Sequence, residues 1–184
     1  DFVFHLAAQS LVGKSYEKPL ETFSVNAIGT ANILESLIQI NKKVTVVMIT
    51  SDKAYDNVEW VWGYKETDKI GGKDPYSASK GMAELAIRSY MESFIRNNSK
   101  NICLGIARAG NVIGGGDWGK DRIVPDCIRS WSKREVVQIR NPNSTRPWQH
   151  VFEPLSGYIT LAMELSNNYE LNGEAFNFGP SASQ

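Results

Sequence analysis

Residues 44–52 read Val-Thr-Val-Val-Met-Ile-Thr-Ser-Asp, an apolar and β-branched run that leads directly into a serine and a carboxylate. β-Branched residues at this density favour an extended strand. An uninterrupted apolar run is typical of a parallel strand that is covered on both faces. The stretch therefore predicts a buried strand whose carboxyl end carries polar groups.

Helical patterns lie on both sides of this strand. Apolar residues recur at helical spacing from Pro19 to Ile38, and again from Tyr76 to about Asn97. Two further apolar runs, Phe2–Ala8 and Asn101–Arg108, have the length and composition of buried strands. Strands that alternate with helices predict right-handed parallel crossovers. We therefore expect an α/β fold, a doubly wound parallel sheet that corresponds to part of a Rossmann fold.

The composition changes after residue 113, where a glycine-rich loop begins. We divide the chain there into a parallel-sheet part, residues 1–113, and a small mixed α/β part, residues 114–184, that is expected to bind substrate. In the second part we expect helices at Ile123–Arg134 and Pro154–Leu165, strands at Val136–Arg140 and from Ala175, and a turn-rich loop at Asn141–Trp148. In the first part, Gln9–Lys18 and Ser51–Pro75 are expected to be loops.

Composition excludes several classes of protein. The 184 residues are 42% hydrophobic and 22% charged, and 20 Lys and Arg balance 20 Asp and Glu. Nothing here indicates a nucleic-acid or membrane surface. Cys103 and Cys127 are far apart and the chain has two histidines, so we expect neither a disulfide framework nor a metal site. A cytoplasmic protein is the default expectation.

Tyr76 and Lys80 lie four residues apart, so a helix places them on one face. A tyrosine that works as a base near neutral pH needs its pKa lowered from about 10, and a neighbouring ammonium has this effect. Such a pair can remove the proton of an alcohol while the carbon gives up a hydride. The spacing also arises by chance, but its position after a strand ending in Ser51 favours catalysis.

Several motifs together resemble the extended short-chain dehydrogenases/reductases that act on nucleotide sugars: His5–Gln9, Val25-Asn26, Thr50–Asp52, Tyr76–Lys80 and Asn111-Val112. Longer stretches are more similar still to the CDP-glucose 4,6-dehydratases: Ile49–Asn57, Gly110–Trp118, Asp121–Asp126 and Arg146–Val151. The resemblance covers essentially the whole chain. It implies that residues 1–113 are the C-terminal part of an NAD-binding Rossmann domain, and that residues 114–184 are a truncated nucleotide-sugar-binding part.

The resemblance implies a set of cofactor-binding residues: Ala7, Ala8, Gln9, Asn26, Tyr76, Lys80 and Ala109. Asn26 would support the cofactor region through backbone contacts, or it is an exposed helix residue. The glycine-rich strand–turn–helix that seats the pyrophosphate in this family does not precede Asp1. Gly114–Gly116 does not replace it, because no first strand and helix flank it. We therefore expect an internal fragment that is inactive and poorly soluble alone.

The resemblance also implies a set of substrate-binding residues: Gln9, Ser10, Asn111, Trp118, Arg122 and Arg146. The two arginines are expected to clamp the substrate pyrophosphate, since a guanidinium binds phosphate bidentately. A surface salt bridge is the alternative for each. His5 is expected to be a core histidine, and the role of His150 stays open.

The catalytic set implied by the resemblance is Ser51, Asp52, Lys53, Tyr76 and Lys80. Ser51 would hydrogen-bond the sugar C4 hydroxyl, or it caps the strand end. Asp52 and Lys53 would help expel water from C5 and C6, or they form a solvated turn. The related dTDP- and GDP-sugar dehydratases usually carry two acidic residues here, so Lys53 indicates a CDP-sugar.

The implied reaction is NAD-dependent dehydration of CDP-glucose to CDP-4-keto-6-deoxyglucose, with internal hydride transfer from C4 to C6. The enzyme would be a lyase of polysaccharide biosynthesis, and a homodimer or homotetramer as the full-length protein. A nucleotide-sugar 4-epimerase or reductase of the same superfamily is one alternative. A non-catalytic NAD-binding protein on this fold is the other.

Overall fold

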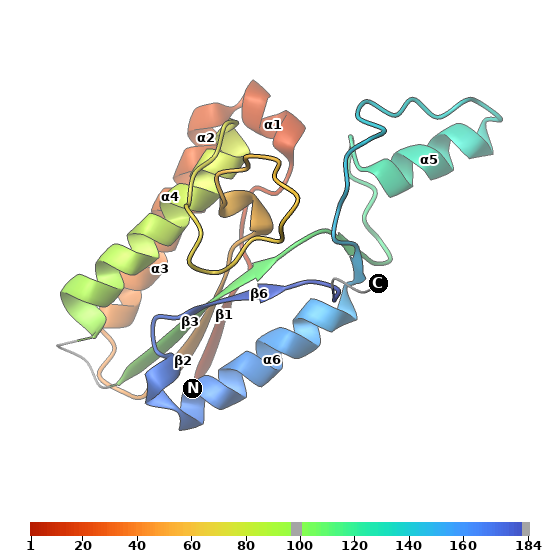
Figure 1. The fold of residues 1–184 in the computed structure, drawn as a ribbon. Helices are drawn as coiled ribbons and strands as arrows, with labels where there is room; N and C mark the ends of the chain where they lie inside the picture. Colours follow the sequence, from red (N-terminus) through yellow and green to blue (C-terminus); the bar gives the residue numbers. More distant parts are fainter. Residues whose placement is uncertain (97–100, 182–184) are drawn as a thin grey trace.

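The computed structural model describes residues 1–96 and 101–181. Four parallel strands form the central sheet in the order β1-β2-β3-β6 (Figure 1). They are β1 (Phe2–His5), β2 (Val44–Ile49), β3 (Ile102–Ala109) and β6 (Ala175–Phe178). Each neighbouring pair is parallel, so all four carboxyl ends lie at the same edge. The predicted α/β fold with a parallel sheet is confirmed.

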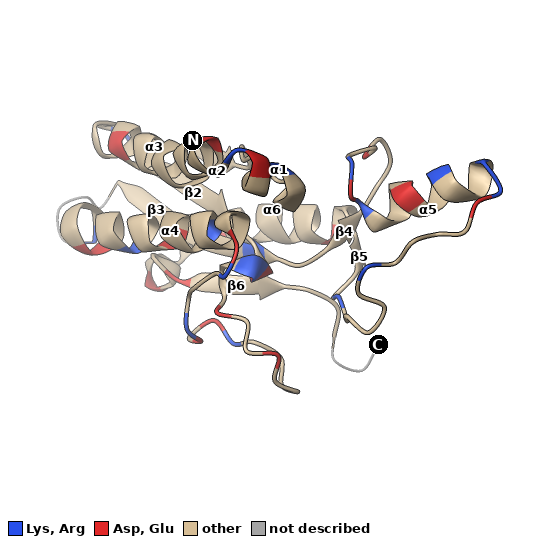
Figure 2. Cartoon of the chain, turned by 90° about the horizontal axis from the view of Figure 1, so that it is seen from above, with Lys and Arg blue, Asp and Glu red and all other residues tan. Residues whose placement is uncertain are grey.

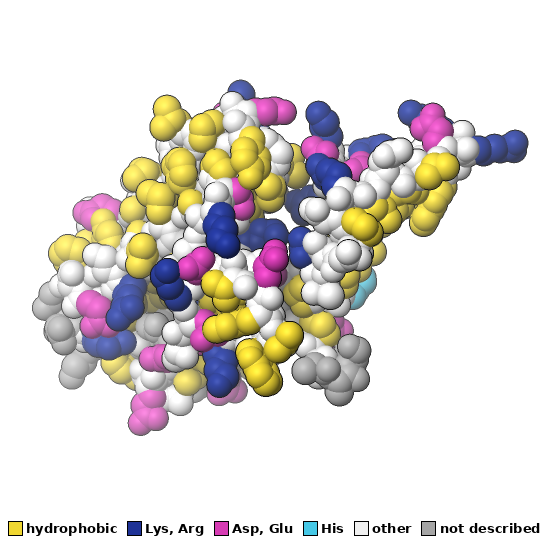
Figure 3. All heavy atoms as spheres, turned by 45° about the horizontal axis from the view of Figure 1, so that its top comes forward, with side chains coloured by type: hydrophobic (Ala, Val, Ile, Leu, Met, Phe, Trp, Pro, Cys, Tyr) yellow, Lys and Arg dark blue, Asp and Glu magenta, His cyan; other side chains and the backbone are white. Residues whose placement is uncertain are grey.

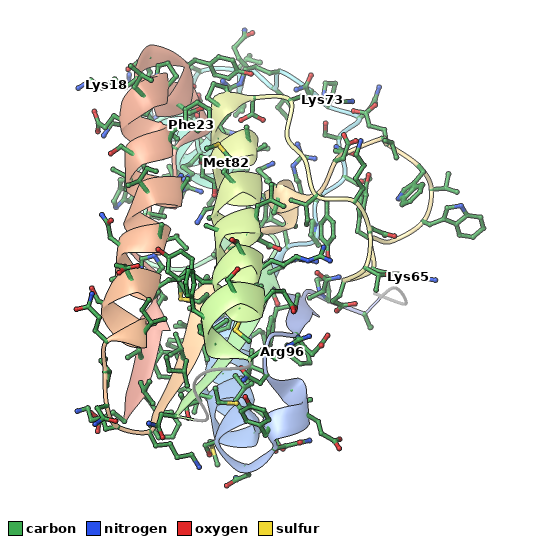
Figure 4. All side chains as sticks on the ribbon, turned by 90° about the vertical axis from the view of Figure 1, so that its left-hand side faces the viewer. Lys18, Phe23, Lys65, Lys73, Met82 and Arg96 are labelled. Atoms are coloured by element: carbon green, nitrogen blue, oxygen red, sulfur yellow. The ribbon has the colours of Figure 1, made fainter. Side chains whose placement is uncertain are left out.

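Two long helical segments cover one face of this sheet (Figure 1). The first is continuous through α2 (Pro19–Phe23), the π-helical segment η1 (Ser24–Ile28) and α3 (Gly29–Ile38). The second joins α4 (Pro75–Tyr90) to the π-helical segment η3 (Met91–Ile95). Figure 4 views this layer from outside, with Phe23 on the first segment and Met82 on α4. Both predicted helices are confirmed at their starts; the predicted stop at Asn97–Ser99 lies outside the described residues.

The opposite face of the sheet is covered by α6 (Phe152–Asn167), which the 3-10 turn η4 (Tyr169–Leu171) joins to β6. Alternation along β2 sends successive side chains to opposite faces. Val46 and Met48 lie in the core under α3 and α4, whereas Val47 packs with Leu161 and Leu165 of α6. The sheet is therefore held between two apolar cores.

Only one face of β1 is covered by the described residues. Val3 packs against the core under α3 and α4. On the α6 side, Phe2 and Phe4 are 54% and 38% exposed. The expectation that this strand is buried on both faces is thus wrong, because α6 covers β2 and β3 but does not reach β1. Among the described residues, the strand is also an edge of the sheet, since it pairs only with β2.

A second, smaller unit projects from the sheet edge as an arm (Figure 2). Two short parallel strands, β4 (Val112–Ile113) and β5 (Gln149–His150), form its base, and α5 (Ile123–Ser132) extends away from it. We call residues 111–151 the arm. The strand expected at Val136–Arg140 is absent, since these described residues are mostly exposed and make no ladder.

The predicted division of the chain at residue 113 needs correction. The arm begins near that position, but α6 and β6 return to the main sheet, where β6 pairs with β3. Residues 152–178 therefore belong to the layer that we assigned to residues 1–113. A further correction concerns Gln9–Lys18, which was expected to be a loop, because Val12–Glu17 forms a short helix, α1.

Candidate active site

The end of β2 and the start of α4 meet at one point of the sheet edge. Directly after β2, Asp52–Ala54 forms the 3-10 turn η2. Ser51 caps this turn, because its Oγ accepts a hydrogen bond of 3.2 Å from the Lys53 backbone N–H and donates one of 3.1 Å to Asp52 Oδ1. The capping role weighed for Ser51 is therefore present, and its hydroxyl is also held beside α4.

The sequence fixes where α4 begins. Asp74 is the N-cap, and its carboxylate accepts hydrogen bonds from the Ser77 backbone N–H at 3.0 Å and from the Ser77 hydroxyl at 2.6 Å. Pro75 occupies the first turn, where its missing N–H costs nothing. Gly72 packs directly on that turn, since an added Cβ would lie 2.3 Å from the Ala78 nitrogen. These contacts place Tyr76 at the sheet edge.

Tyr76 is 8% exposed, and its electrostatic environment identifies its neighbours. Burial is the main influence and raises the pKa of the phenol. A hydrogen bond with Ser51 and the charge of Arg122 act in the opposite direction, while Asp52 raises the pKa further. The phenol is thus protonated at neutral pH in this state. It becomes a base only when additional positive charge lies beside it.

Lys80 lies on the same face of α4, one turn after Tyr76, and is 7% exposed. Burial lowers its pKa to about 8, against the charge of Glu84, which raises it. Within residues 1–96 and 101–181, no hydrogen bond or ion pair engages the Lys80 amine. A mostly protonated ammonium on a buried side chain, with no hydrogen-bond partner among the described residues, is suited to bind a ligand.

Asn26 and Gln9 are joined by buried hydrogen bonds next to the start of α4. Asn26 is 2% exposed, so the alternative of an exposed helix residue is wrong. Its side chain accepts from the Gln9 backbone N–H at 2.8 Å and donates to the Gln9 carbonyl at 3.0 Å and to Ser79 Oγ at 2.8 Å. The residue lies in the π-helical segment η1, a distortion often found at functional sites. Asn26 therefore fixes the turn after β1 against α4.

The Gln9 side chain is also fully engaged within the chain. Its amide nitrogen donates to the Leu11 carbonyl and to Thr22 Oγ1, each at 3.0 Å, and its oxygen accepts from the Leu11 N–H at 2.6 Å. The geometry supports a turn-forming role for Gln9, and its predicted ligand contacts stay a prediction. The neighbouring strand-end residues Ala7, Ala8 and Ala109 have small side chains, which let a ligand approach the backbone.

The predicted substrate residues divide into two groups. Arg122 comes close to the predicted catalytic residues, because its Nη2 donates to Ser10 Oγ at 3.4 Å and its charge acts on Tyr76. Its Nε forms an ion pair of 3.4 Å with Asp117 but is buried with no hydrogen-bond partner among the described residues. Figure 3 shows Lys and Arg side chains in the hollow between the arm and the main body.

The other predicted substrate residues lie further out on the arm. Trp118 is 58% exposed and stacks on Arg129, whose guanidinium carbon is 5.9 Å from the ring centroid. Arg146 is exposed and donates at 2.7 Å to the neighbouring Thr145 carbonyl. The Asn111 carbonyl accepts from the Gln149 N–H at 3.1 Å and closes the base of the arm. The structure does not bring Trp118 or Arg146 into contact with the catalytic residues.

Sequence reasoning missed the buried polar groups beneath the site. Thr50, Glu84 and Arg108 form a hydrogen-bonded cluster, and none of them was a candidate. One signal was available, since Glu84 follows Lys80 by four residues on the same helix face.

The two histidines of the chain differ in burial. His5 is half-buried next to Thr30, whereas His150 is exposed beside Phe152.

Two searches of the described residues were negative. No group of three His, Cys, Asp or Glu side chains in residues 1–96 and 101–181 is arranged to hold a metal ion. Over the same residues, none of the helices combines the length and the apolar composition needed to span a bilayer.

A family comparison identifies the class of protein to which this fold and site belong. The model of a family described as GDP-mannose 4,6 dehydratase matches residues 1–177. The chain therefore belongs to the GDP-mannose 4,6-dehydratase family. It spans about half the length of the curated relatives it matches.

Individual relatives narrow the resemblance. The chain is 54% identical over 183 residues to a CDP-glucose 4,6-dehydratase of Salmonella typhimurium, which covers 98% of this chain and 51% of that protein. It is 27% identical to a CDP-paratose 2-epimerase of Salmonella typhi, over 97% of this chain and 57% of the relative. The resemblance to the CDP-glucose 4,6-dehydratases is thus confirmed.

Solved structures share the fold. A dTDP-glucose 4,6-dehydratase of Streptomyces venezuelae, DesIV, with NAD and DAU bound, matches with a TM-score of 0.80 at 20% identity, covering 97% of this chain and 52% of that one. A UDP-glucuronic acid 4-epimerase of Bacillus cereus, in complex with UDP-glucuronic acid and NAD, matches with a TM-score of 0.82 at 22% identity, covering 98% and 54%.

Proposed function

We propose that this chain carries the catalytic centre of an NAD-dependent CDP-glucose 4,6-dehydratase, which converts CDP-glucose to CDP-4-keto-6-deoxyglucose. The observation that carries the proposal is the convergence of Ser51, Asp52 and Tyr76 at one strand end. The residue after Asp52 is a lysine, and the relative with 54% identity is named for this activity. An acid, an amine and a phenol beside one hydroxyl-binding serine suit both oxidation and loss of water.

The residues at the sheet edge fit the nicotinamide part of NAD. Lys80 has a buried side chain whose ammonium makes no hydrogen bond among the described residues. Ala7, Ala8 and Ala109 have small side chains, so a ligand can approach the backbone at the strand ends. Gln9 and Asn26 shape the turn that would border the cofactor. Bound here, NAD would supply the acceptor for the C4 hydride and, once reduced, the hydride donor for C6.

The chain's own groups handle the protons. Tyr76 takes the proton of the C4 hydroxyl, which Ser51 hydrogen-bonds, and Lys80 favours the phenolate. The resulting 4-ketone acidifies the C5 proton. Asp52 and Lys53 then remove that proton and protonate the departing C6 hydroxyl, and they return a proton to C5 when the hydride reaches C6, with their roles left undivided. Arg122, whose Nη2 faces Ser10, holds the substrate pyrophosphate together with Arg146, and Ser10, Asn111 and Trp118 line the sugar nucleotide.

The direct test supplies the full-length protein that contains this chain with NAD and CDP-glucose, and follows the 4-keto-6-deoxy product by mass spectrometry. Matched reactions with dTDP-glucose, GDP-mannose and UDP-glucose test the choice of nucleotide. We expect turnover with CDP-glucose to exceed the others by at least about tenfold, a difference of about 1.4 kcal/mol in transition-state binding. Brisk turnover of another nucleotide sugar with none of CDP-glucose would overturn the substrate assignment.

A 4-epimerase or reductase of the same superfamily is the second candidate, because it shares Tyr76 and Lys80. Such an enzyme needs no acid or base at positions 52 and 53. The double variant Asp52→Asn, Lys53→Met would leave an epimerase largely active. In a dehydratase we expect loss of about 10²-fold or more in product formation, the usual size of an acid–base contribution.

A homodimer or homotetramer is proposed for the full-length protein, and light scattering measures its oligomeric state.

A further inference from the structure

We propose that the buried ion pair of Glu84 and Arg108 positions the catalytic groups, by holding the end of β2 against α4 and by keeping a negative charge one helical turn from Lys80. The proposal rests on the proposed function, because it assigns Lys80 a part in catalysis. Glu84 and Arg108 are positioning residues, since neither is placed against the substrate.

The pair itself is well satisfied. Arg108 Nε donates to the two carboxylate oxygens of Glu84 at 2.8 and 3.0 Å, and Nη2 also donates to Glu84 Oε2. The two side chains are 5% and 3% exposed. Charges this deeply buried are tolerated when their hydrogen bonds are complete, but removing them from water costs free energy that apolar side chains do not pay. An apolar pair of equal volume would serve stability as well, so the ion pair calls for another explanation.

One side of the pair fixes the catalytic strand end. Thr50 Oγ1 donates to Glu84 Oε1 at 2.6 Å, and Thr50 is the residue immediately before Ser51. Glu84 belongs to the same helix as Tyr76 and Lys80. A single carboxylate therefore links the segment that carries Ser51 and Asp52 to the helix that carries Tyr76 and Lys80.

The other side of the pair fixes the far end of the η2 turn. Arg108 Nη1 donates to Tyr55 Oη at 2.7 Å and to the Glu66 carbonyl at 2.8 Å. Tyr55 follows η2, and its hydroxyl donates to Asn177 Oδ1 of β6 at 2.7 Å. Figure 4 labels Lys65 in the loop that contains Glu66, on the side of α4 that faces away from the first helical segment. Asp52 and Lys53 are thus held between two anchors, Thr50 and Tyr55, that both reach the same ion pair.

The same geometry acts on the charge of Lys80. Glu84 is the group whose charge raises the Lys80 pKa against the lowering effect of burial. His5 of β1 is lowered in pKa by burial and by Lys80, which keeps its ring neutral. The acidic side chains of α2 and α3, Glu21 and Glu35, are engaged with Lys14 and Tyr90. Further titratable groups on elements packed against α4 are Lys14, Tyr16 and Glu17 of α1, Asp52 and Lys53 of η2, Arg108 of β3 and Tyr76 of α4 itself.

The test compares three substitutions in the full-length protein. Glu84→Gln removes the charge at nearly constant shape. Glu84→Asp keeps the charge but shortens the reach, which separates charge from position. Asn172→Ala is the matched control, because Asn172 is equally buried and hydrogen-bonds the other end of β3, at the Leu104 N–H and the Ile102 carbonyl. Steady-state kinetics with CDP-glucose over a range of pH are the first readout.

We expect Glu84→Gln to lower kcat at least about tenfold with KM nearly unchanged, and to move the basic limb of the pH profile down by about one pH unit. Glu84→Asp should lower kcat while leaving that limb in place. Asn172→Ala should lower the melting temperature without moving the limb. If Glu84→Gln fails to fold, Thr50→Val removes only the hydroxyl link; we expect a drop of about threefold or more in kcat.

A second readout does not depend on turnover. The rate at which an acylating reagent modifies Lys80, mapped by peptide mass spectrometry across pH, reports the free amine. In Glu84→Gln the modification should begin at lower pH than in the wild-type protein. A wild-type protein that dehydrates no nucleotide sugar would defeat the proposed function, whereas unchanged Lys80 modification together with an unchanged Thr50→Val protein would defeat this inference.

Discussion

The strand-end site and the arm solve the placement of polar side chains in opposite ways. At the strand ends, Tyr76 and Lys80 are less than a tenth exposed. They lie on the same helix as Glu84, which forms the buried ion pair with Arg108. On the arm, Trp118 is 58% exposed and Arg146 bonds to its own neighbour. The proposed catalytic side chains Tyr76 and Lys80 are therefore held in place by burial, whereas Trp118 and Arg146, proposed to bind substrate from the arm, are exposed.

The apolar surface of the arm points to the same difference. One face of α5 and the base of the arm line an open groove of about 380 Å³: Ile113, Ile123, Val124, Cys127, Ile128, Trp131 and Trp148. Trp131 is 65% exposed there, whereas Leu34 and Leu104 in the main core are fully buried. Core packing restrains the catalytic groups, and few contacts among the described residues restrain the arm.

The largest expected effect concerns the buried strand-end site, at Tyr76. Tyr76→Phe removes the phenolic hydroxyl and should lower kcat by about 10²–10⁴-fold, the usual range for a lost acid–base group. Binding of the nucleotide sugar, measured by calorimetry, should change little because the ring remains. Tyr90→Phe on the same helix is the control, and its kcat should match the wild type. A Tyr76→Phe protein with a tenth or more of wild-type kcat would remove Tyr76 from the mechanism.

A second prediction uses the buried ammonium of Lys80. The folded chain releases this proton near pH 8, whereas the unfolded chain keeps it up to the ordinary pKa of 10.5. Between these values the unfolded state binds more protons, so the free energy of unfolding rises with pH. Relative to Lys80→Met, the wild type should gain about 2 kcal/mol between pH ~7.5 and ~9.5 in denaturant titrations. A constant difference between the two proteins would mean that Lys80 is not buried.

The smallest expected effect concerns the arm. Arg122→Ala removes the donor nearest Ser10 and should raise KM for the nucleotide sugar about tenfold with kcat little changed, since a charged hydrogen bond that is partly exposed contributes about 1–2 kcal/mol. Lys133→Ala, an exposed cation beyond the end of α5, is the control and should leave KM unaltered. Equal KM values in all three proteins would place the phosphate clamp elsewhere.

Local patterns were sufficient for the central strands of the main sheet and for the two helical segments on one of its faces. The apolar runs that became β2 and β3, and the helical spacing after Pro19 and Tyr76, gave elements of the right type in the right order. The patterns failed where local signals were weak. The strand expected at Val136–Arg140 has β-branched residues but no neighbouring strand to pair with. α1 was missed because Leu11, at its N-cap position, offers no side-chain cap.

The sequence by itself determined the chemistry at the sheet edge: which strand ends in Ser51 and Asp52, and which helix opens with Tyr76 and carries Lys80. Only the tertiary structure decided what supports them. Glu84 and Arg108 are 24 residues apart, and β6 joins the sheet from beyond the arm. Such pairings depend on which elements pack together, because a buried charge is stable only where its partner arrives from another element.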